Sequence, residues 1–245
     1  MKPPYPSMKL SGRRDSSLTG TLVLDGFHLQ GRLGQGRFGT CYAVSRDTRD
    51  YVLKIFNAND VKRRKDKLTR EILWLKEIDH PAIPKLIQVL DRDGFYGLIM
   101  EKQPGNSLED LLDWDYNFQK TEITAIMNQL IAVMCYLEAM KISHRDIKAS
   151  NILWTGTELS LIDFGSARKS PQWRTRFNPD FWGIGDVFMR LASGCQELTP
   201  GSNGFSADHL NLNDHQKQLI KRLLYLDKPY TNFTELQKSF VQSFL

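Results

Sequence analysis

The first half of the chain shows the alternation of hydrophobic and polar positions that is typical of β-strands. The alternation begins at Phe27, Leu29 and Leu33, and it resumes after a run of glycines with a β-branched stretch at residues 40–45. Side chains two residues apart in a strand lie on the same face, so this pattern predicts strands with one buried face. Three further hydrophobic runs predict strands at residues 51–56, 86–90 and 95–100.

The second half of the chain changes to helical spacing. Its clearest hydrophobic stripe predicts a helix at residues 121–140, with Thr121 as the expected N-cap. A region of strands followed by a region of helices predicts an α+β fold. The stripe consists of Ile123, Ile126, Met127, Leu130, Met134 and Leu137. Further helices are predicted at residues 60–78, 214–226 and 232–244.

The N-terminal segment has neither pattern. Residues 1–20 are rich in proline, serine, glycine and basic side chains, and they lack the hydrophobic positions that a packed element needs. We therefore predict a disordered basic tail at residues 1–20 and a folded domain at residues 21–245. A solvated tail is favoured over one that binds a polyanion such as nucleic acid or an anionic membrane surface.

Composition narrows the class of protein. The chain has 245 residues, of which 41% are hydrophobic and 25% charged, with a formal net charge of +5, as in ordinary globular domains. Its cysteines, Cys41, Cys135 and Cys195, are too few and too far apart to predict a disulfide framework or a zinc site, which favours the reducing cytoplasm. No hydrophobic run reaches transmembrane length, and the N-terminus lacks the hydrophobic core of a signal peptide.

A lysine, Lys54, interrupts the hydrophobic run at residues 51–56. A charge in such a run is costly to bury unless an opposite charge pairs with it. Glu71 is the natural partner, because it lies on the hydrophobic face of the next predicted helix, three residues after Leu68 and four before Leu75. The sequence therefore predicts a buried ion pair between Lys54 and Glu71.

The segment Gly34-Gln35-Gly36-Arg37-Phe38-Gly39 has a glycine spacing that brings a backbone close to phosphate groups. Dinucleotide-binding folds use the same spacing, but there the glycines open a helix. Here a strand-like run follows the glycines, which favours a hairpin whose backbone covers phosphates. Phe38, at the tip of this hairpin, would shield the phosphates from water.

The stretch from His144 to Asn151 reads His-Arg-Asp-Ile-Lys-Ala-Ser-Asn, and Asp163-Phe164-Gly165 follows it. These groups fit phosphoryl transfer, in which a carboxylate orients or deprotonates the incoming hydroxyl and a nearby cation neutralises the migrating phosphoryl group. An amide oxygen and a second carboxylate hold Mg²⁺ against the nucleotide phosphates. A His-Arg-Asp tripeptide alone is weakly specific, but Lys148, Asn151 and the Asp-Phe-Gly turn at these offsets make the pattern specific.

With these motifs in this order, residues 27 to about 194 resemble a Ser/Thr protein kinase of the eukaryotic-like type, and the compactness resembles that of the smallest bacterial members. Lys148, two positions after Asp146, matches the Ser/Thr pattern rather than the Tyr pattern. The resemblance implies a cleft that binds ATP and Mg²⁺, with Mn²⁺ as an alternative metal. It also implies a two-lobed α+β fold, with a small antiparallel-sheet N-lobe at about residues 26–101, a hinge at 101–105 and a mainly helical C-lobe at 106–245.

The resemblance also implies a role for each residue of the catalytic stretch. Asp146 is the base or the residue that orients the acceptor hydroxyl, and Lys148 steadies the transferred phosphoryl group. Asn151 and Asp163 are the metal ligands. The expected product is a phosphorylated Ser or Thr in a protein of unknown identity.

The nucleotide-binding residues follow from the same resemblance. Lys54, held by Glu71, aligns the α- and β-phosphates. At the hinge Met100 is the gatekeeper, while the carbonyl of Glu101 and the amide of Gln103 face the adenine edge. The other residues expected around the nucleotide are Leu33, Gly34, Gly36, Phe38, Gly39, Cys41, Val52 and Leu153.

The chain departs from the family pattern after the Asp-Phe-Gly turn. Asp163 and Asp180, which opens a predicted buried helix, are only 17 positions apart, so the activation segment between them is short. It has no Ala-Pro-Glu tripeptide, and the stretch Asp227–Tyr230 lacks the arginine that pairs with the glutamate of this tripeptide in the family. Loss of both partners is physically consistent, because one buried unpaired charge would cost about 3–5 kcal/mol. The usual platform for substrate peptides therefore does not carry over.

Other interpretations stay open at this point. A small-molecule phosphotransferase on the same fold is favoured by the missing peptide platform but opposed by Lys148, and a nucleotide-binding scaffold without turnover is opposed by the intact catalytic positions. Control by phosphorylation of the activation segment is not favoured, although Arg145 would receive such a phosphate and Ser166, Ser170 and Thr175 offer hydroxyls. Because the segment is short there is little to order, so we expect activity in the unphosphorylated protein. A solvated helix face is favoured over a polyanion-docking site for the basic cluster Lys62, Arg63, Arg64, Lys65 and Lys67.

Overall fold

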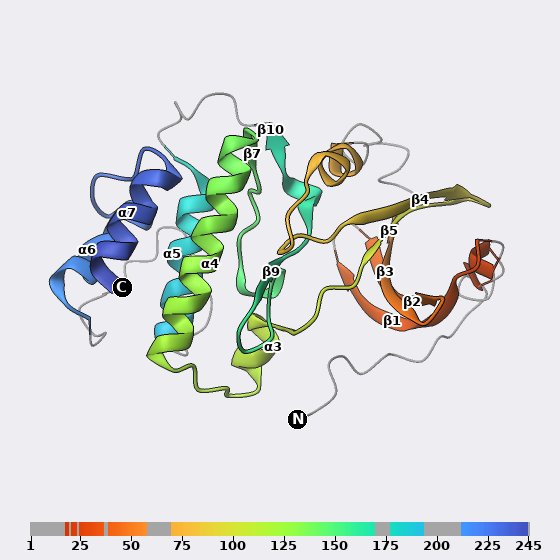
Figure 1. Cartoon of the computed structure of the whole chain (residues 1–245), viewed down its shortest axis with the longest axis horizontal. Helices are drawn as coiled ribbons and strands as arrows, with labels where there is room; N and C mark the ends of the chain where they lie inside the picture. The colour runs from red at the N-terminus through yellow and green to blue at the C-terminus, as the bar shows by residue number, and fades with distance from the viewer. Residues whose placement is uncertain are drawn as a thin grey trace. The chain divides into compact units, whose positions relative to one another are not determined.

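The computed structural model describes residues 18, 19, 21–23, 25–36, 39–57, 70–169, 177–193 and 212–244. The chain divides into two units, Met1–Gln103 and Pro104–Leu245, which we call the N-terminal unit and the C-terminal unit. The first contains an antiparallel sheet and the second is mainly helical (Figure 1), so the predicted α+β class is confirmed. The division falls inside the segment predicted as the hinge, residues 101–105.

The sheet of the N-terminal unit has five antiparallel strands in the order β1-β2-β3-β5-β4. Two of its hairpins close through two-residue turns, Asp47-Thr48 and Asp93-Gly94, whose residues all have positive φ. Turns of this kind match the right-handed twist of the strands that they connect. The strands are β1 (His28–Gly36), β2 (Gly39–Arg46), β3 (Arg49–Phe56), β4 (Leu86–Arg92) and β5 (Phe95–Glu101).

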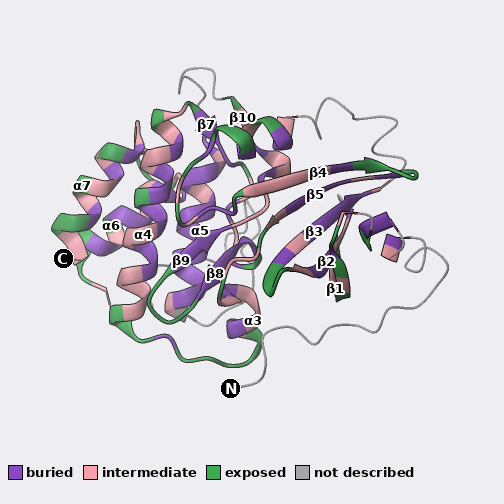
Figure 2. Cartoon of the chain, turned by 45° about the vertical axis from the view of Figure 1, so that its right-hand side comes forward, coloured by how far each residue is buried: buried purple, intermediate pink, exposed green. Residues whose placement is uncertain are grey.

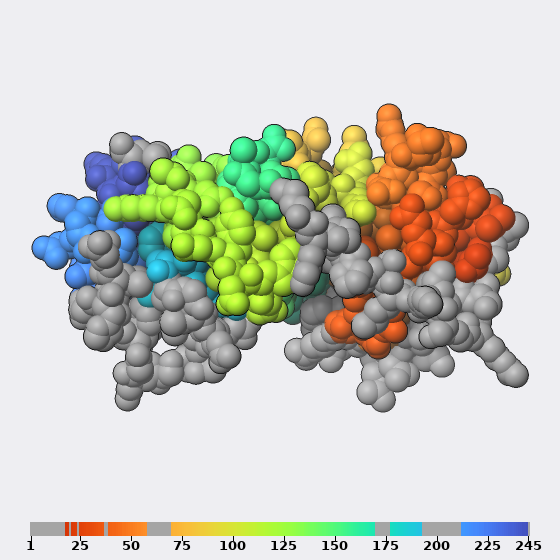
Figure 3. Space-filling model, turned by 90° about the horizontal axis from the view of Figure 1, so that it is seen from below, coloured from red at the N-terminus to blue at the C-terminus, as the bar shows by residue number. Residues whose placement is uncertain are grey.

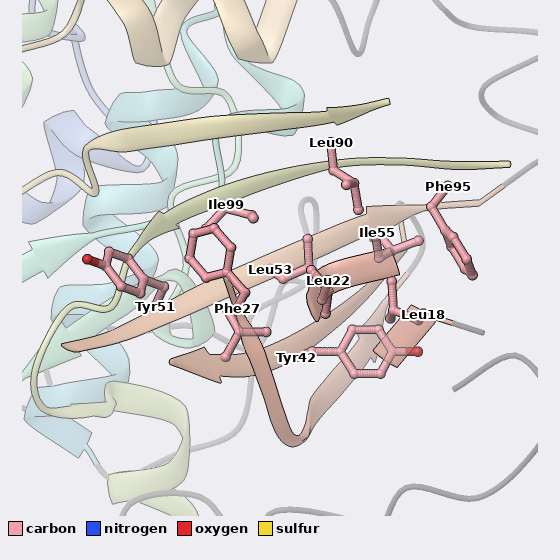
Figure 4. Close-up of a cluster of buried hydrophobic side chains, with 11 residues drawn as sticks. Leu18, Leu22, Phe27, Tyr42, Tyr51, Leu53, Ile55, Leu90, Phe95 and Ile99 are labelled. Carbon is pink, nitrogen blue, oxygen red and sulfur yellow. The ribbon is translucent and has the colours of Figure 1, made fainter. Parts of the chain in front are cut away.

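A hydrophobic cluster forms the core of this unit (Figure 4). Tyr51, Leu53 and Ile55 alternate along β3, so their side chains project from the same face of the sheet. Leu18 and Leu22, which belong to a short helical segment before β1, pack against the same cluster and are only 1% and 0% exposed. Burial of these side chains fixes the N-terminal segment to the sheet.

The position of Leu18 differs from the sequence-based expectation of a disordered tail over residues 1–20. Leu18 and Leu22 are four residues apart, which places both on one face of a helical turn. This pair is too short a pattern to stand out among the surrounding polar residues. The tail residues other than 18 and 19 lie outside the described part of the chain.

The other helices of the C-terminal unit lie around α5, most of whose described residues are buried (Figure 2). Both α4 and α6 pack against α5, and α7 packs against α4 and α6. The surfaces of α6 and α7 lie side by side at one end of this unit (Figure 3). None of the described helices combines the length and the hydrophobicity that a membrane span requires. The helices are α3 (Leu108–Asp113), α4 (Lys120–Ala139), α5 (Pro179–Ser193), α6 (Asp214–Leu223) and α7 (Phe233–Phe244).

The start of α4 corrects one detail of the prediction. The N-cap is Gln119 rather than Thr121, which lies inside the first turn. The backbone N–H of Gln119 donates to Oε2 of Glu122 at 3.0 Å, as in a capping box. Glu122 stands three residues after Gln119, and this spacing decides which residue caps the helix.

Short strands and 3-10 turns shape the loops of the C-terminal unit. One small sheet has the order β6-β8-β9, and a separate pair joins β7 to β10. Apart from β6, these elements flank or overlap the two motifs that the sequence singles out. They are β6 (Asn106–Ser107), β7 (Ile142–Ser143), β8 (Ile152–Trp154), β9 (Leu159–Leu161), β10 (Arg168–Lys169), η1 (Ala149–Asn151) and η2 (Phe164–Ser166).

Candidate active site

A buried ion pair joins Lys54 and Glu71 in the N-terminal unit. Lys54 lies on β3 between its register partners Cys41 on β2 and Leu98 on β5, and Glu71 belongs to the helical residues 70–77. Nζ of Lys54 is 2.8 Å from Oε1 of Glu71, and the two side chains are only 7% and 2% exposed. The predicted pair is therefore confirmed, and each charge needs the other because both are shielded from water.

The other predicted nucleotide-binding residues of this unit lie on the strands around Lys54. Gly39 has a φ of 157°, and a Cβ there would lie 2.1 Å from the carbonyl oxygen of Ile55, so only glycine fits at the start of β2. Phe38 lies outside the described residues. The remaining residues are Leu33, Gly34 and Gly36 on β1, Cys41 on β2, Val52 on β3, Met100 and Glu101 at the end of β5, and Gln103 in the segment after it.

Asp146 lies in the loop between β7 and η1 of the C-terminal unit, and two predicted partners contact it. Nζ of Lys148 is 3.1 Å from Oδ2 of Asp146. Nδ2 of Asn151 donates to the same Oδ2 at 3.0 Å and to the backbone carbonyl of Asp146 at 2.9 Å. The structure thus brings Asp146, Lys148 and Asn151 together, with the carboxylate held by a cation and an amide.

The β8–β9 hairpin places Asp163 close to this group. The backbone N–H of Ile162 donates to the carbonyl of Asn151 at 2.9 Å, so Asn151 and Asp163 lie at the same end of the hairpin. Asp163 adopts a left-handed conformation, with φ 66° and ψ 80°, and its Oδ1 accepts from the backbone N–H of Gly165 at 3.3 Å. Such a backbone is uncommon for a residue other than glycine, and it is one of the features that cluster at functional sites.

The rings of His144 and Phe164 pack against each other and so join the two motifs. The ring of His144 is fully buried and meets the ring of Phe164 edge-on, with centroids 4.8 Å apart. Burial lowers the pKa of His144 and outweighs the opposing effect of the nearby carboxylates, so the ring is neutral at pH 7. Nε2 lies 3.2 Å from the carbonyl oxygen of Ile162, which only accepts, so Nε2 carries the proton.

Asp180, near the start of α5, holds the backbone of residues 144–151, which we call the catalytic loop. Its Oδ2 accepts from Oγ of Ser143 at 2.6 Å and from the backbone N–H of His144 at 3.1 Å, and its Oδ1 accepts from the backbone N–H of Arg145 at 2.5 Å. Sequence reasoning missed this role and placed Asp180 only at the start of a buried helix. The available signal was the charge itself, because a carboxylate on a hydrophobic helix requires donors.

A second residue of α5 brings the helix close to the same loop. A Cβ on Gly183 would lie 2.5 Å from the carbonyl oxygen of Ile147, the residue after Asp146. Glycine at this position therefore allows the loop backbone to pack directly on the helix. Asp180 and Gly183 contact the backbone on either side of Asp146 and therefore fix its position relative to α5.

The donor set of Asn151 and Asp163 fits Mg²⁺. This ion prefers oxygen ligands and is commonly held by one or two carboxylates together with substrate phosphates. Nδ2 of Asn151 is directed at Asp146, which leaves Oδ1 as the atom that faces away from that contact. An amide oxygen and a carboxylate at one end of the β8–β9 hairpin are suitable ligands for a hard cation.

The remaining residues that the sequence singles out lie partly inside and partly outside the described part of the chain. Leu153, predicted beneath the adenine, lies on β8 and is 5% exposed, while Ser166 lies in η2 and is partly buried. Ser170, Thr175 and the basic cluster at residues 62–67 lie outside the described part of the chain. The comparisons below give no support to a polyanionic partner for that cluster.

Comparison with known proteins agrees with this geometry. The protein kinase domain family matches residues 27–178. The probable serine/threonine-protein kinase YbdM of Bacillus subtilis is 28% identical over 233 residues, which cover 89% of this chain and 90% of that protein. Calcium-dependent protein kinase 4 of Plasmodium falciparum is 27% identical over 236 residues, which cover 78% of this chain and 44% of that protein.

A third relative, the serine/threonine-protein kinase pakH of Dictyostelium discoideum, is 28% identical over 196 residues, which cover 69% of this chain and 37% of that protein. The chain thus spans most of the bacterial relative but less than half of either of these two eukaryotic relatives. The family match covers more than half of the chain and includes the Lys54–Glu71 pair, the loop around Asp146 and the turn at Asp163. This chain therefore belongs to the protein kinase domain family.

Proposed function

We propose that this chain is an ATP-dependent kinase that transfers the γ-phosphate of ATP to serine and threonine hydroxyls of protein substrates. The observation that carries the proposal is the contact of Asp146 with both Lys148 and Asn151. Membership of the protein kinase family and the names of the relatives support the same activity. The position of Lys148, two residues after Asp146, supports Ser/Thr rather than Tyr as the acceptor.

Asp146 carries the central role in this proposal. Its carboxylate accepts a hydrogen bond from the acceptor hydroxyl and orients the oxygen for in-line attack on phosphorus. Asn151 fixes the carboxylate through Oδ2, while Oδ1 is not part of that contact. Lys148 lies beside the same carboxylate, where its charge offsets the negative charge of the transferred phosphoryl group.

Two sets of residues are proposed to bind the nucleotide and its metal ion. Lys54, held by Glu71, contacts the α- and β-phosphates, and its buried partner keeps the ammonium group extended in one direction. Asn151 and Asp163 bind the divalent cation that accompanies ATP. Mg²⁺ bound there supplies neutralisation of the phosphate charge, and Mn²⁺ can replace it because both ions accept oxygen ligands.

The test uses purified protein, ATP labelled in its γ-phosphate, Mg²⁺ and a heat-treated cell lysate as the source of acceptors. We expect label in protein bands, and hydrolysis of those bands should release phosphoserine and phosphothreonine. The matched control is Asp146→Asn, which keeps the size of the side chain and should incorporate label about 10²–10⁴-fold more slowly. Label that the control incorporates equally would show that a contaminating kinase is responsible.

The same experiment separates the two alternatives. Label confined to the low-molecular-mass fraction would identify a small-molecule phosphotransferase and contradict the protein-kinase proposal. ATP binding without any transfer or hydrolysis would identify a nucleotide-binding scaffold. Parallel reactions with Mg²⁺, Mn²⁺ and a chelator establish which cation the site uses.

The proposal includes a cytoplasmic location. Cys41 and Cys135 are not joined in a disulfide, and burial raises the pKa of Cys135 to about 11, which keeps its thiol protonated. Proteins of oxidising compartments more commonly pair their cysteines in disulfides. Fractionation of cells into cytoplasm and membranes, with immunodetection of the chain, tests this part.

A further inference from the structure

The tyrosine that follows α6 contacts the end of the activation segment, which we define as the residues between Asp163 and Asp180. The hydroxyl oxygen of Tyr225 accepts from the backbone N–H of Asn178 at 2.5 Å, and the hydroxyl donates to the carbonyl of Asn178 at 3.3 Å. The ring of Tyr225 also lies against the ring of Phe177, with centroids 4.9 Å apart. One side chain therefore satisfies both backbone groups of Asn178.

The backbone of Tyr225 is unusual for such a large residue. Its φ is 62°, and the C-terminus of α6 closes on it with two hydrogen bonds, from Tyr225 N–H to the carbonyl of Arg222 and from Leu226 N–H to the carbonyl of Lys221. This is a Schellman motif, in which glycine usually occupies the left-handed position. A bulky residue there is an outlier, so its side chain rather than its backbone preference accounts for its presence.

Asn178, which Tyr225 holds, in turn contacts the first turn of α5. Its Oδ1 accepts from the backbone N–H of Asp180 at 2.9 Å, and its carbonyl accepts from the backbone N–H of Trp182 at 3.4 Å, so Asn178 caps the helix. Pro179 occupies the first helical position, where proline needs no donor. The start of α5 is thus fixed by Asn178, and Asn178 is fixed by Tyr225.

The next contact in this series reaches the catalytic loop. The carboxylate of Asp180 is fully buried and accepts from the backbone N–H groups of His144 and Arg145. Arg145 itself has a φ of 65°, and the following residue is Asp146. A displacement of the start of α5 would therefore move the backbone that presents Asp146.

From this series of contacts we propose that Tyr225 is a positioning residue for phosphoryl transfer. Its hydroxyl holds Asn178, which holds the start of α5, and Asp180 then holds the catalytic-loop backbone before Asp146. The proposal rests on the kinase activity proposed above. Burial raises the pKa of the Tyr225 hydroxyl, so the hydroxyl remains a donor at neutral pH.

The test compares Tyr225→Phe with wild type. This change removes only the hydroxyl and keeps the ring against Phe177. We expect kcat to fall about three- to tenfold, which corresponds to the usual worth of one or two hydrogen bonds, while KM for ATP changes by less than about twofold. Hydrogen exchange measured by mass spectrometry should be faster in the peptide that contains the amides of His144 and Arg145. This second readout does not depend on catalytic activity or on knowledge of the substrate.

Two further variants separate positioning from general stability. Tyr225→Gly provides the residue that the left-handed position favours, so we expect it to keep or raise Tm while it lowers kcat as Tyr225→Phe does. Tyr230→Phe is the matched control, because the Tyr230 hydroxyl bonds Oγ of Ser239 at 3.0 Å and lies in the same region of the chain. We expect Tyr230→Phe to leave both kcat and the exchange of the catalytic-loop amides unchanged.

The outcomes that overturn the proposal are specific. Unchanged amide exchange in Tyr225→Phe would show that the hydroxyl does not hold the loop, whatever the activity. Unchanged kcat in Tyr225→Gly would show that the side chain is dispensable for catalysis. An inactive wild type would contradict the proposed kinase function, and the exchange measurement would then still decide the structural part.

Discussion

The Oδ1 atom of Asp180 accepts a hydrogen bond from the backbone N–H of Arg145 at 2.5 Å, and Arg145 has a left-handed backbone with φ 65°. A non-glycine residue in that conformation costs on the order of 1–3 kcal/mol and persists only where surrounding contacts determine it. Asp180 supplies those contacts from a fully buried position on α5. The loop that carries Asp146 is therefore shaped by a residue 35 positions later in the chain.

The first prediction tests this contact with Asp180→Asn. The amide keeps one acceptor oxygen but places an NH₂ group where the second oxygen accepted, so one buried donor of the loop meets another donor. We expect kcat to fall about 10–100-fold, as displacements near 1 Å do in active sites, and Tm to fall as well. Initial-rate kinetics and thermal unfolding measure both quantities. Wild-type turnover in this variant would mean that the loop keeps its shape without Asp180.

The second prediction concerns Asp146→Asn. If Asp146 orients or deprotonates the acceptor hydroxyl, kcat should fall about 10²–10⁴-fold, the usual contribution of a general base. Binding of ATP with Mg²⁺ should persist, because Asp146 is not one of the proposed metal ligands and the amide that replaces it keeps an oxygen that can accept from Asn151. Calorimetric titration measures the binding, and labelled phosphate transfer measures the turnover.

Asp163→Ala is the contrasting control for that experiment. It removes an anionic ligand, so we expect weaker binding of ATP in the presence of Mg²⁺ and little change in its absence. The two variants should therefore separate turnover from metal-dependent binding. Equal ATP affinity in Asp163→Ala and wild type would contradict the proposed role of the turn at Asp163.

The third prediction concerns stability and pH. Burial tends to raise the pKa of Glu235, but hydrogen bonds from Thr231 and Arg222 outweigh this and hold the pKa at about 2. A lowered carboxylate pKa contributes stability that is complete above the unfolded-state pKa near 4.5 and is lost as pH falls toward 2. Glu235→Gln should therefore lower the free energy of unfolding at pH 7 by about 1 kcal/mol, a value reduced for solvent screening.

The difference between wild type and Glu235→Gln should narrow as pH falls from 5 to 3, since the wild-type carboxylate loses its advantage in that range. Urea unfolding at a series of pH values measures it. A constant difference across the range would show that the contribution of Glu235 comes from packing rather than from its charge.

Local chemistry made part of this site predictable from the sequence. Lys54 and Glu71 each break a hydrophobic pattern, and two opposite charges in neighbouring buried elements imply each other. Asp146 and Asn151 are five positions apart in one loop, so their contact needs no knowledge of the rest of the fold. The strands and helices were predictable for the same reason, because the spacing of hydrophobic residues that identifies each of them lies within a short stretch of sequence.

The residues that sequence reasoning missed act through long-range contacts. Asp180 and Tyr225 meet the catalytic loop and Asn178 only after α5 and α6 have packed, and nothing near either residue in sequence indicates its partner. The burial of Leu18 was also not predictable, because Leu18 and Leu22 contact residues of the sheet that are distant in sequence. Gln119 is the local exception, because its spacing to Glu122 is visible in the sequence and is a stronger capping signal than Thr121.

The last prediction separates the structural and functional parts of the Lys54–Glu71 pair. Glu71→Leu removes the carboxylate that lies 2.8 Å from the buried ammonium group of Lys54, so it should lower the free energy of unfolding by about 3–5 kcal/mol. The double variant Lys54→Met with Glu71→Leu replaces both charges with side chains of similar size. It should recover most of that loss, because a buried pair replaced by packed hydrophobic residues is commonly neutral or stabilising.

The activities of these variants should not follow their stabilities. If Lys54 contacts the phosphates, the double variant should be as inactive as Glu71→Leu even though it is nearly as stable as wild type, since it lacks the ammonium group proposed to align the nucleotide. Urea unfolding and labelled phosphate transfer on the same preparations provide the comparison. A stable and active double variant would show that the pair only holds the N-terminal unit together. A double variant as unstable as Glu71→Leu would show that hydrophobic side chains cannot replace the ion pair at these two positions.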